Sequence, residues 1–194
     1  MTGKTIYHFE ERPHIRYQFY KMPVFWRSKL FNQGAKLSQR PYLCFYDADV
    51  LIQPNALEES VKRLERNMFI LPYNGILLNV KGGCRQHVID TLDISSIPFV
   101  PTNRKQQPRL KKEVEIYGGV IDSVGGLCLL PRDIFFEYGS YNEEMILWGP
   151  EDCEIEYRFR MCGIPTTRLD DFNLIHLAHY REPYSATVDQ PYHE

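Results

Sequence analysis

The sequence predicts an α/β fold, and two observations support that class. Segments of strand character alternate with segments of helical periodicity between residues 23 and 80. Among them an apolar run, YLCFY over residues 42–46, stops at two aspartates, Asp47 and Asp49. An unbroken apolar run is typical of a strand buried on both faces, and open α/β sheets bind ligands beyond the carboxyl ends of their strands. We therefore expect a buried strand here and a ligand site at its end.

Ahead of these aspartates, the chain has room for two extended segments and one long helix. Residues 5–9 and 14–20 have strand character. Over residues 23–37 apolar side chains recur at helical spacing, which predicts a helix in which Arg27 and Asn32 are polar exceptions.

A helix and two strands are expected after the aspartates. Asn55 is followed three residues later by a glutamate, the pattern of a capping box, which predicts a helix over residues 55–66. Residues 68–71 and 75–80 then have strand character and flank an Asn74-Gly75 pair. We expect these two strands to pair around that turn.

The periodic pattern breaks down from about residue 90 to residue 113. This stretch is rich in Pro, Asn, Gln, Arg and Lys, which predicts a long, mobile surface loop, and such loops often cover binding sites. A strand is expected over residues 121–130, where Gly125 and Gly126 indicate the close approach of another backbone or a ligand. A short helix over residues 131–139 follows.

A second pair of acids stands at the start of the next predicted helix, residues 150–162. Pro150 suits the first helical position, and Glu151 and Asp152 follow it in the first turn. Acidic residues in the first turn of a helix are ordinarily explained by their favourable interaction with the helix dipole. Here Trp148 lies just before them, and because its side chain could line a ligand site, it favours a binding site. The helix N-terminus is expected to keep Asp152 ionised, as a general base must be.

Oxygen and nitrogen ligands for a metal ion are also present. In extended backbone Asp47 and Asp49 would face the same side, where a hard ion such as Mn²⁺ or Mg²⁺ suits their oxygens. A lone D-x-D pair also occurs as a simple turn cap, so this pattern alone is weak. His176 and His179 would point to opposite faces of an extended segment, which predicts that one reaches the site and the other is structural. One histidine with the aspartates would suit Mn²⁺.

Composition narrows the class of protein. The 194 residues, 43% of them hydrophobic, predict one domain spanning residues 1–194. A formal net charge of -2 argues against a nucleic-acid binder. The sequence has neither an apolar run of membrane-spanning length nor a signal-peptide core, and its five cysteines lack metal-ligand spacing. We expect a soluble, cytoplasmic protein with reduced, mostly buried thiols.

Three blocks of this sequence resemble the β-1,4-galactosyltransferases and related GT-A enzymes. The first, FWRSKLFNQGAKLSQRPYLCFYDADVLI, has an F-x-R-x-K-L-x-N-x-G helix ahead of D-x-D. The second, VGGLCLLPRDIFFEYGSYNEEMILWGPEDCEIEYRFRMCG, is similar to their Gly-Gly strand, G-x-N-E and W-G-G-E-D signature, with Pro150 replacing the second glycine of W-G-G-E-D. The third, HLAHYR, resembles their histidine motif, shared with chondroitin-polymerase-like and polypeptide N-acetylgalactosaminyltransferase domains.

The resemblance implies a GT-A fold, a Rossmann-like nucleotide-diphospho-sugar transferase domain with a mixed central sheet. Because only 46 residues precede Asp47, the nucleotide-binding half would be shortened at its N-terminus. In the metal site implied by the motifs, Asp47 lies near the donor ribose and the metal, Asp49 ligates the metal, and His179, chosen over His176 by its place in the motif, is the further ligand.

The same resemblance implies that Asp152 is the catalytic base. Other motif residues would bind substrate: Arg27 the donor nucleotide, Gly125 and Gly126 the donor sugar, and Trp148 and Glu151 the sugar or acceptor.

The function implied is a metal-dependent, inverting glycosyltransferase of polysaccharide or glycoconjugate synthesis. It would move a hexose or N-acetylhexosamine from a nucleotide-diphosphate sugar, expected to be UDP-linked, to a hydroxyl of a saccharide acceptor. Two alternatives stay open: a non-catalytic remnant that binds nucleotide sugars or carbohydrate, and a metal-dependent hydrolase using Asp47, Asp49 and His179. A sugar-phosphate nucleotidyltransferase is disfavoured because residues 1–20 contain no Gly-rich phosphate loop.

Overall fold

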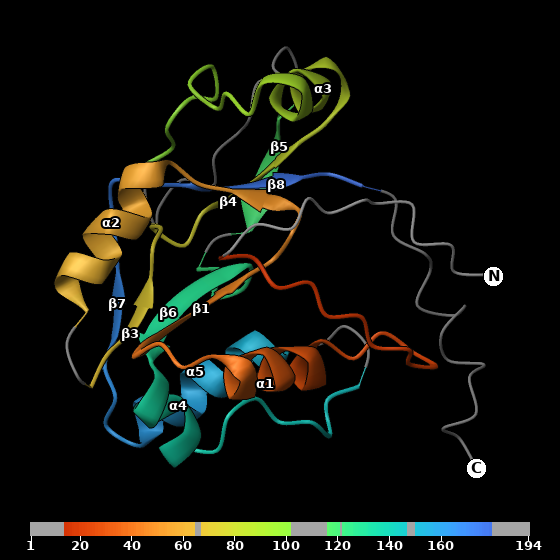
Figure 1. Ribbon diagram of the computed structural model, residues 1–194. Helices are drawn as coiled ribbons and strands as arrows, with labels where there is room; N and C mark the ends of the chain where they lie inside the picture. Colours follow the sequence, from red (N-terminus) through yellow and green to blue (C-terminus); the bar gives the residue numbers. More distant parts are fainter. Residues whose placement is uncertain (1–13, 65–66, 102–115, 121, 147–149, 180–194) are drawn as a thin grey trace.

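The computed structural model describes residues 14–64, 67–101, 116–120, 122–146 and 150–179. Within these residues the strands form two four-stranded sheets, drawn one above the other in Figure 1. In order across the first sheet, the strands are β1 (Tyr42–Tyr46), β6 (Leu127–Pro131), β3 (Phe69–Leu71) and β7 (Thr166–Arg168). Across the second they are β2 (Val50–Leu51), β8 (Leu174–Leu177), β4 (Leu77–Val80) and β5 (Ile116–Val120). The α/β class is confirmed, with two sheets in place of one central sheet.

Each sheet contains both parallel and antiparallel pairs. β3 pairs in parallel with β7, and β4 pairs in parallel with β8, whereas the other pairs are antiparallel. The predicted hairpin between residues 68–71 and 75–80 is wrong, because β3 and β4 lie in different sheets. Gly75 does turn the chain, with φ of 88°, but the turn carries it from the first sheet into the second.

The two sheets are joined by four short connections that are hydrogen-bonded to one another. These connections are β1 to β2, β3 to β4, β5 to β6 and β7 to β8. The amide of Asp47 donates to Gly126 O (2.9 Å), that of Ser123 to Gly75 O (2.9 Å), and that of Asn74 to Phe172 O (2.8 Å). The connections therefore form a continuous belt of backbone between the sheets, and the predicted site residues of the D-x-D and Gly-Gly motifs lie on it.

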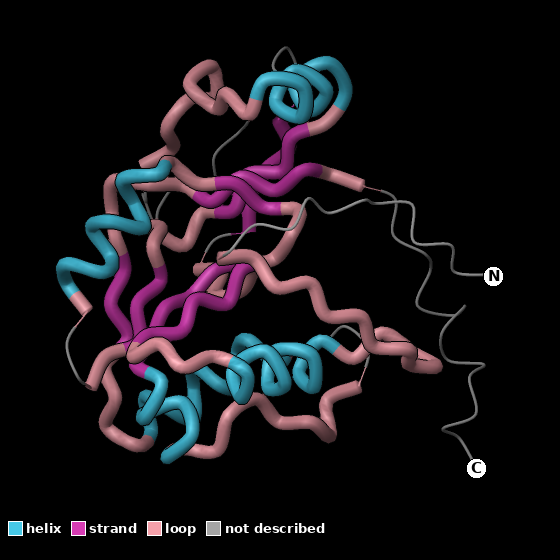
Figure 2. Tube along the Cα trace, in the orientation of Figure 1, coloured by secondary structure: helices cyan, strands magenta, loops and turns pink. Residues whose placement is uncertain are grey.

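Helices cover the outer faces of the sheets (Figure 1). The helices are α1 (Arg27–Leu37), α2 (Pro54–Arg63), α3 (Gly82–Thr91), α4 (Arg132–Glu137) and α5 (Glu151–Met161). α1, α4 and α5 lie together on the side of the first sheet that faces away from the second, and α3 lies beyond the second sheet (Figures 1 and 2). No helix among the described residues is both long enough and apolar enough to span a membrane.

Two hydrophobic cores correspond to the two sheets. In the larger core, Phe45 of β1 packs against Phe31 of α1 (ring centroids 5.0 Å apart), Phe135 of α4 (4.9 Å) and Tyr141 (5.1 Å, edge to face). Aromatic side chains bury much apolar surface each, so this cluster fixes α1 and the chain near residue 141 against the end of β1. The smaller core joins β4, β8 and α3.

Some boundaries of the helices differ from those predicted. α1 begins at Arg27, four residues later than expected. α2 begins at Pro54, so Asn55 lies inside the helix and does not cap it; proline suits the first helical position because it has no N–H to satisfy. α3 was not expected from the sequence, because Val88 is its single buried residue and the helix therefore has no amphipathic pattern.

Several expectations about strands and the loop also changed. β1 alternates between exposed and buried residues, so the prediction that both faces are covered is wrong. Of the strand expected over residues 121–130, β6 begins only at Leu127. Residues 5–9, and the part of the expected loop from 102 to 113, lie outside the described residues, and residues 14–20 form no strand. All five cysteines are free thiols, but the expectation that most of them are buried is wrong, because Cys44, Cys153 and Cys162 are exposed.

Candidate active site

The two aspartates of the D-x-D motif face different partners. They lie on the β1–β2 connection, where the chain turns and the amide of Val50 donates to Asp47 O (3.3 Å). Because a turn does not keep the two-residue period of a strand, the carboxylates diverge. Asp47 contacts Arg27, whereas Asp49 contacts two histidines. The expectation that both aspartates face one side is therefore wrong, and the connection instead links two adjoining groups of charged side chains.

The first group consists of three carboxylates around one guanidinium. Arg27 Nη1 donates to Glu151 Oε1 (2.9 Å) and Asp152 Oδ1 (2.8 Å), and its Nε donates to Asp47 Oδ1 (3.0 Å). Arg27 is the first residue of α1, and the two acids are the first residues of α5, so two helix starts converge on the end of β1. Arg27 is only 6% exposed and Glu151 only 2%. Three negative charges against one positive charge leave the group acidic.

Burial and pairing shift the pKa values in this acidic group. Burial raises the pKa of Asp152 to about 6, although the charge of Arg27 opposes the rise. The pKa of Asp47 is also raised by burial and partly restored by Arg27. Burial would lower the pKa of Arg27, but Asp152 and Asp47 raise it above its ordinary value. We expected the helix N-terminus to keep Asp152 ionised; burial raises the pKa of this carboxyl, but with a pKa of about 6 it is still ionised at neutral pH.

The Gly-Gly segment packs directly on Asp152. A Cβ atom added to Gly125 would lie 2.7 Å from Asp152 Oδ2, so only glycine leaves the carboxylate in its place. Gly126 has φ of 87°, and a Cβ there would lie 2.8 Å from the side chain of Leu174. The close approach expected at these glycines is therefore made by the side chains of α5 and β8. Tyr73, fully buried, donates from its hydroxyl to Gly125 O (2.7 Å) and holds this segment.

Tyr73 was not predicted from the sequence, and neither was the role of Asn32. Asn32 is 4% exposed; its Nδ2 donates to Tyr141 O (2.9 Å) and Glu143 Oε1 (2.9 Å), and its Oδ1 accepts from the Tyr141 amide (3.0 Å). The Tyr141 hydroxyl in turn donates to Asp152 Oδ1 (3.4 Å). For Asn32 the sequence does contain a signal of a structural role, because it is a polar residue within the apolar pattern of a helix. No sequence signal identified Tyr73, since an aromatic residue before a turn is common.

The second group contains Asp49, His176 and His179. Asp49 Oδ2 lies 2.9 Å from His179 Nε2 and 3.4 Å from His176 Nε2, and the possible ligand atoms are all within 4.8 Å of one another. The prediction that the histidines point to opposite faces is wrong: β8 ends at Leu177, between them, and their ring centroids are 5.5 Å apart. Among the described residues, Asp47 is not part of this group.

This second group fits a divalent metal ion. His176 is buried, and its Nε2 forms no hydrogen bond with any described residue although it lies beside a carboxylate. An aspartate carboxylate such as that of Asp49 is ionised at neutral pH, as a metal ligand must be. Two imidazole nitrogens and a carboxylate oxygen are ligands that transition metals such as Mn²⁺ accept.

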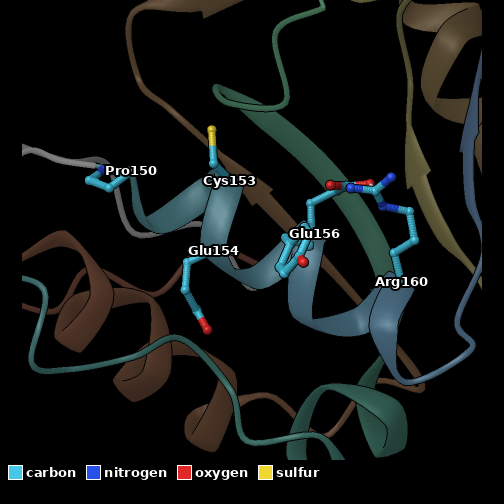
Figure 3. A pocket seen from close by; sticks show the side chains of 6 residues that line it. Pro150, Cys153, Glu154, Glu156 and Arg160 are labelled. Carbon is cyan, nitrogen blue, oxygen red and sulfur yellow. The ribbon is translucent and has the colours of Figure 1, made fainter.

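The remaining predicted residue, Trp148, lies outside the described residues. A hollow of about 400 Å³ opens on the surface of α5, lined by Pro150, Cys153, Glu154, Glu156, Tyr157 and Arg160 (Figure 3). None of the predicted site residues that the structure describes lines this hollow. It shares a helix with Asp152 but contains no part of the acidic group or of the histidine group.

Relatives of this chain include several sugar transferases. "Probable N-acetylgalactosaminyltransferase 9" of Caenorhabditis elegans is 40% identical over 63 residues, 32% of this chain and 11% of that protein. N-acetylgalactosaminyltransferase 7 of Homo sapiens is 37% identical over 68 residues, 34% of this chain and 10% of that protein. Polypeptide N-acetylgalactosaminyltransferase 4 of C. elegans is 22% identical over 166 residues, 79% and 27% respectively. The matches thus span about a tenth to a quarter of these relatives.

Two solved structures are similar at low identity. The catalytic domain of Drosophila beta1,4galactosyltransferase 7, in complex with xylobiose, has a TM-score of 0.47 and 20% identity, with 84% of this chain and 54% of that chain covered. The structure of GalNAc-T7 with UDP, GalNAc and Mn²⁺ has a TM-score of 0.48 and 19% identity, with 77% and 30% covered.

A family assignment follows from the match over most of the chain. The family described as "Glycosyl transferase family 2" matches residues 11–139, which is more than half of the 194 residues. The matched residues include α1, the D-x-D connection, the Gly-Gly segment and strands β1 to β6, but neither β7 nor β8. The predicted GT-A class agrees with this match, and the chain belongs to glycosyl transferase family 2.

Proposed function

We propose that this chain is a metal-dependent, inverting glycosyltransferase that moves a hexose or N-acetylhexosamine from a UDP-linked donor to a hydroxyl of a saccharide acceptor. Membership of glycosyl transferase family 2 and the names of the sequence relatives support sugar transfer. One observation supports the chemistry. Asp152, a carboxyl with a raised pKa, shares Arg27 with Asp47, and Asp47 is two residues from Asp49 of the proposed metal-binding group on the β1–β2 connection.

Asp152 has the properties of a general base. With a pKa of about 6 it is ionised at neutral pH, yet it is basic enough to accept the proton of an attacking hydroxyl. Arg27 and Tyr141 both donate to its Oδ1, which orients the carboxylate, while Oδ2 faces Gly125. Deprotonation of the acceptor on one face of the donor sugar, as the diphosphate leaves from the other, inverts the anomeric carbon in a single displacement.

Asp49, His176 and His179 are the residues that would hold Mn²⁺ or Mg²⁺. When bound, the ion neutralises negative charge on the departing diphosphate. His176 is buried on β8 and His179 is more than a third exposed beyond the end of that strand, so one ligand is held by the sheet and the other faces solvent. This set adds His176 to the ligands expected from the motifs. It does not include Asp47, which pairs with Arg27.

The remaining residues would bind the two substrates. Arg27 is paired within the acidic group with Asp47, which is two residues along the chain from Asp49, and both would contact the donor nucleotide and its ribose. Gly125 lies beside Asp152, and Gly125 and Gly126 would face the donor sugar. Glu151 and Trp148 would contact the sugar or the acceptor.

A thermal-shift panel of UDP- and GDP-sugars, with and without Mn²⁺, tests donor binding, because a ligand that binds the native state raises its stability. We expect a UDP-sugar to stabilise the chain only when Mn²⁺ is present. Incubation of that donor with saccharide acceptors, followed by NMR of the product, then gives the anomeric configuration.

Each result of this panel decides between the functions. Transfer with inversion supports the proposal, and transfer with retention overturns the single displacement by Asp152. Donor binding with no turnover selects the non-catalytic remnant, and release of free sugar with no transfer selects the hydrolase.

A further inference from the structure

The sheet register places a specific polar side chain beside His176. β8 lies between β2 and β4, and His176 is opposite Val50 of β2 and Asn79 of β4. Val50 is 3% exposed and its side chain is apolar, so it offers the imidazole no hydrogen bond. Asn79 supplies the polar neighbour: its Oδ1 lies 2.7 Å from His176 Nδ1.

This contact determines which imidazole nitrogen carries the proton. A carboxamide oxygen only accepts hydrogen bonds, so the nitrogen that contacts it, His176 Nδ1, must be the donor. In the neutral ring the other nitrogen, Nε2, then has a bare lone pair. That Nε2 is buried, has no hydrogen bond to a described residue, and lies 3.4 Å from Asp49 Oδ2. A lone pair facing a carboxylate is repulsive unless a cation lies between them.

We propose that Asn79 is a positioning residue that holds His176 in the Nδ1–H tautomer, so that His176 Nε2 is presented as a metal ligand together with Asp49 and His179. This inference rests on the proposed metal-dependent function. Metal-binding histidines commonly donate their second N–H to an oxygen acceptor, and loss of such an outer contact typically lowers metal affinity by about 10–100-fold. Asn79 itself would not touch the ion.

The three variants that separate this role from a packing role are Asn79→Leu, Asn79→Asp and Val50→Ala. Asn79→Leu has a similar volume but no acceptor. Asn79→Asp keeps an oxygen acceptor and is the conservative rescue. Val50→Ala removes side-chain volume at the position opposite His176 on the other neighbouring strand while leaving the acceptor in place, so it is the matched control.

The first measurement is ¹⁵N NMR of the histidine rings in the metal-free, full-length chain at mildly alkaline pH. We expect the His176 signals of the wild type, Asn79→Asp and Val50→Ala to have the pattern of a protonated Nδ1 and a bare Nε2. In Asn79→Leu the two tautomers should mix. A protonated Nε2 in the wild type would overturn the proposal, because the amide of Asn79 would then be donating.

The second measurement is Mn²⁺ titration followed by the EPR signal of the free ion. We expect Asn79→Leu to bind Mn²⁺ about 10–100-fold more weakly than the wild type, and Asn79→Asp and Val50→Ala to stay within a few-fold of it. If the wild type binds Mn²⁺ and Asn79→Leu binds it equally well, the role of Asn79 is overturned and the proposed function stands. A wild type that binds no Mn²⁺ overturns the metal-dependent function as well.

Discussion

Arg27 donates a 2.8 Å hydrogen bond to Asp152 across 125 positions of sequence. The bond joins the first turn of α1 to the first turn of α5. The guanidinium of Arg27 thereby contacts the carboxyl that we propose as the base. Because Arg27 also contacts Asp47 and Glu151, the protonation of Asp152 is coupled to the residues that would bind the donor.

Asp152→Asn is expected to lower turnover by about 10²–10⁴, the usual contribution of a positioned general base, while Mn²⁺-dependent donor binding stays nearly unchanged. Initial rates and calorimetry of donor binding measure the two effects separately. Glu154→Gln is the control, since Glu154 lies in the same helical turn but pairs with Arg158. Normal turnover in Asp152→Asn would mean that another group accepts the proton.

The raised pKa of Asp152 also predicts how stability depends on pH. In the folded chain this pKa is about 6 and its ordinary value is 3.8, so the folded state binds the proton more tightly and the stability contributed by Asp152 falls as the pH rises from about 4 to 6. Asp152→Asn has no carboxyl at this position, so its stability does not decrease for this reason as the pH rises. The variant should therefore gain up to about 2–3 kcal/mol of unfolding free energy relative to the wild type between these pH values. Urea unfolding at a series of pH values tests this, and a constant difference across the series would contradict it.

The same pKa predicts the pH profile of transfer. Since Asp152 must be ionised to accept a proton, kcat/KM should rise as the pH rises through about 6 and level off above it. Replacing Glu143, which contacts Asn32 and not Asp152, should leave the midpoint of this rise unchanged. A midpoint near the ordinary pKa of an exposed aspartate would show that burial does not tune the base.

Local pattern predicted α5, most of α1 and β1, because helix starts, apolar spacing and a short apolar run are properties of neighbouring residues. Sheet pairing was predicted wrongly where two strands adjoin in sequence. β3 and β4 looked like a hairpin, but β3 pairs with β6 and β7, and no local signal encodes a partner almost a hundred residues away. The same reason explains why Asn79 was not found: it is significant only because β4 lies beside β8.

The divergence of Asp47 and Asp49 separates their expected effects on metal binding. Asp49→Ala should weaken Mn²⁺ binding by more than about 100-fold. This loss exceeds the loss of about 10–100-fold that is typical when a residue outside the ligand set is changed, because Asp49→Ala removes a ligand. Asp47→Asn should leave Mn²⁺ binding within about 10-fold, because Asp47 contacts Arg27 and is outside the histidine group. Calorimetry with the metal alone, repeated in the presence of chelator, measures both variants. Equal losses would place both carboxylates on the ion.

Gly125→Ala tests whether the position of Asp152 matters as well as its charge. The backbone of Gly125 permits alanine, but the added Cβ would lie 2.7 Å from Asp152 Oδ2 and push the carboxylate away. Because the base is displaced, we expect kcat to fall by at least about 10-fold. The fraction of folded protein should change little. Gly34→Ala is the control: nothing lies within 4 Å of its added Cβ, and it should stabilise α1 by about 0.5–1 kcal/mol without affecting kcat. An unchanged kcat in Gly125→Ala would mean that Asp152 tolerates displacement.

Tyr73→Phe should affect both stability and transfer, because one hydroxyl connects the interior to the Gly-Gly segment. The Tyr73 hydroxyl donates to Gly125 O (2.7 Å), and phenylalanine would keep the packing of the ring while leaving that carbonyl without this donor. Loss of a donor to a buried acceptor costs about 1–3 kcal/mol, which urea unfolding would detect. Since Gly125 lies against Asp152 Oδ2, the loosened segment should also lower kcat while KM for the donor changes less. A variant that loses stability but keeps the wild-type kcat would show that Tyr73 supports the fold without positioning the base.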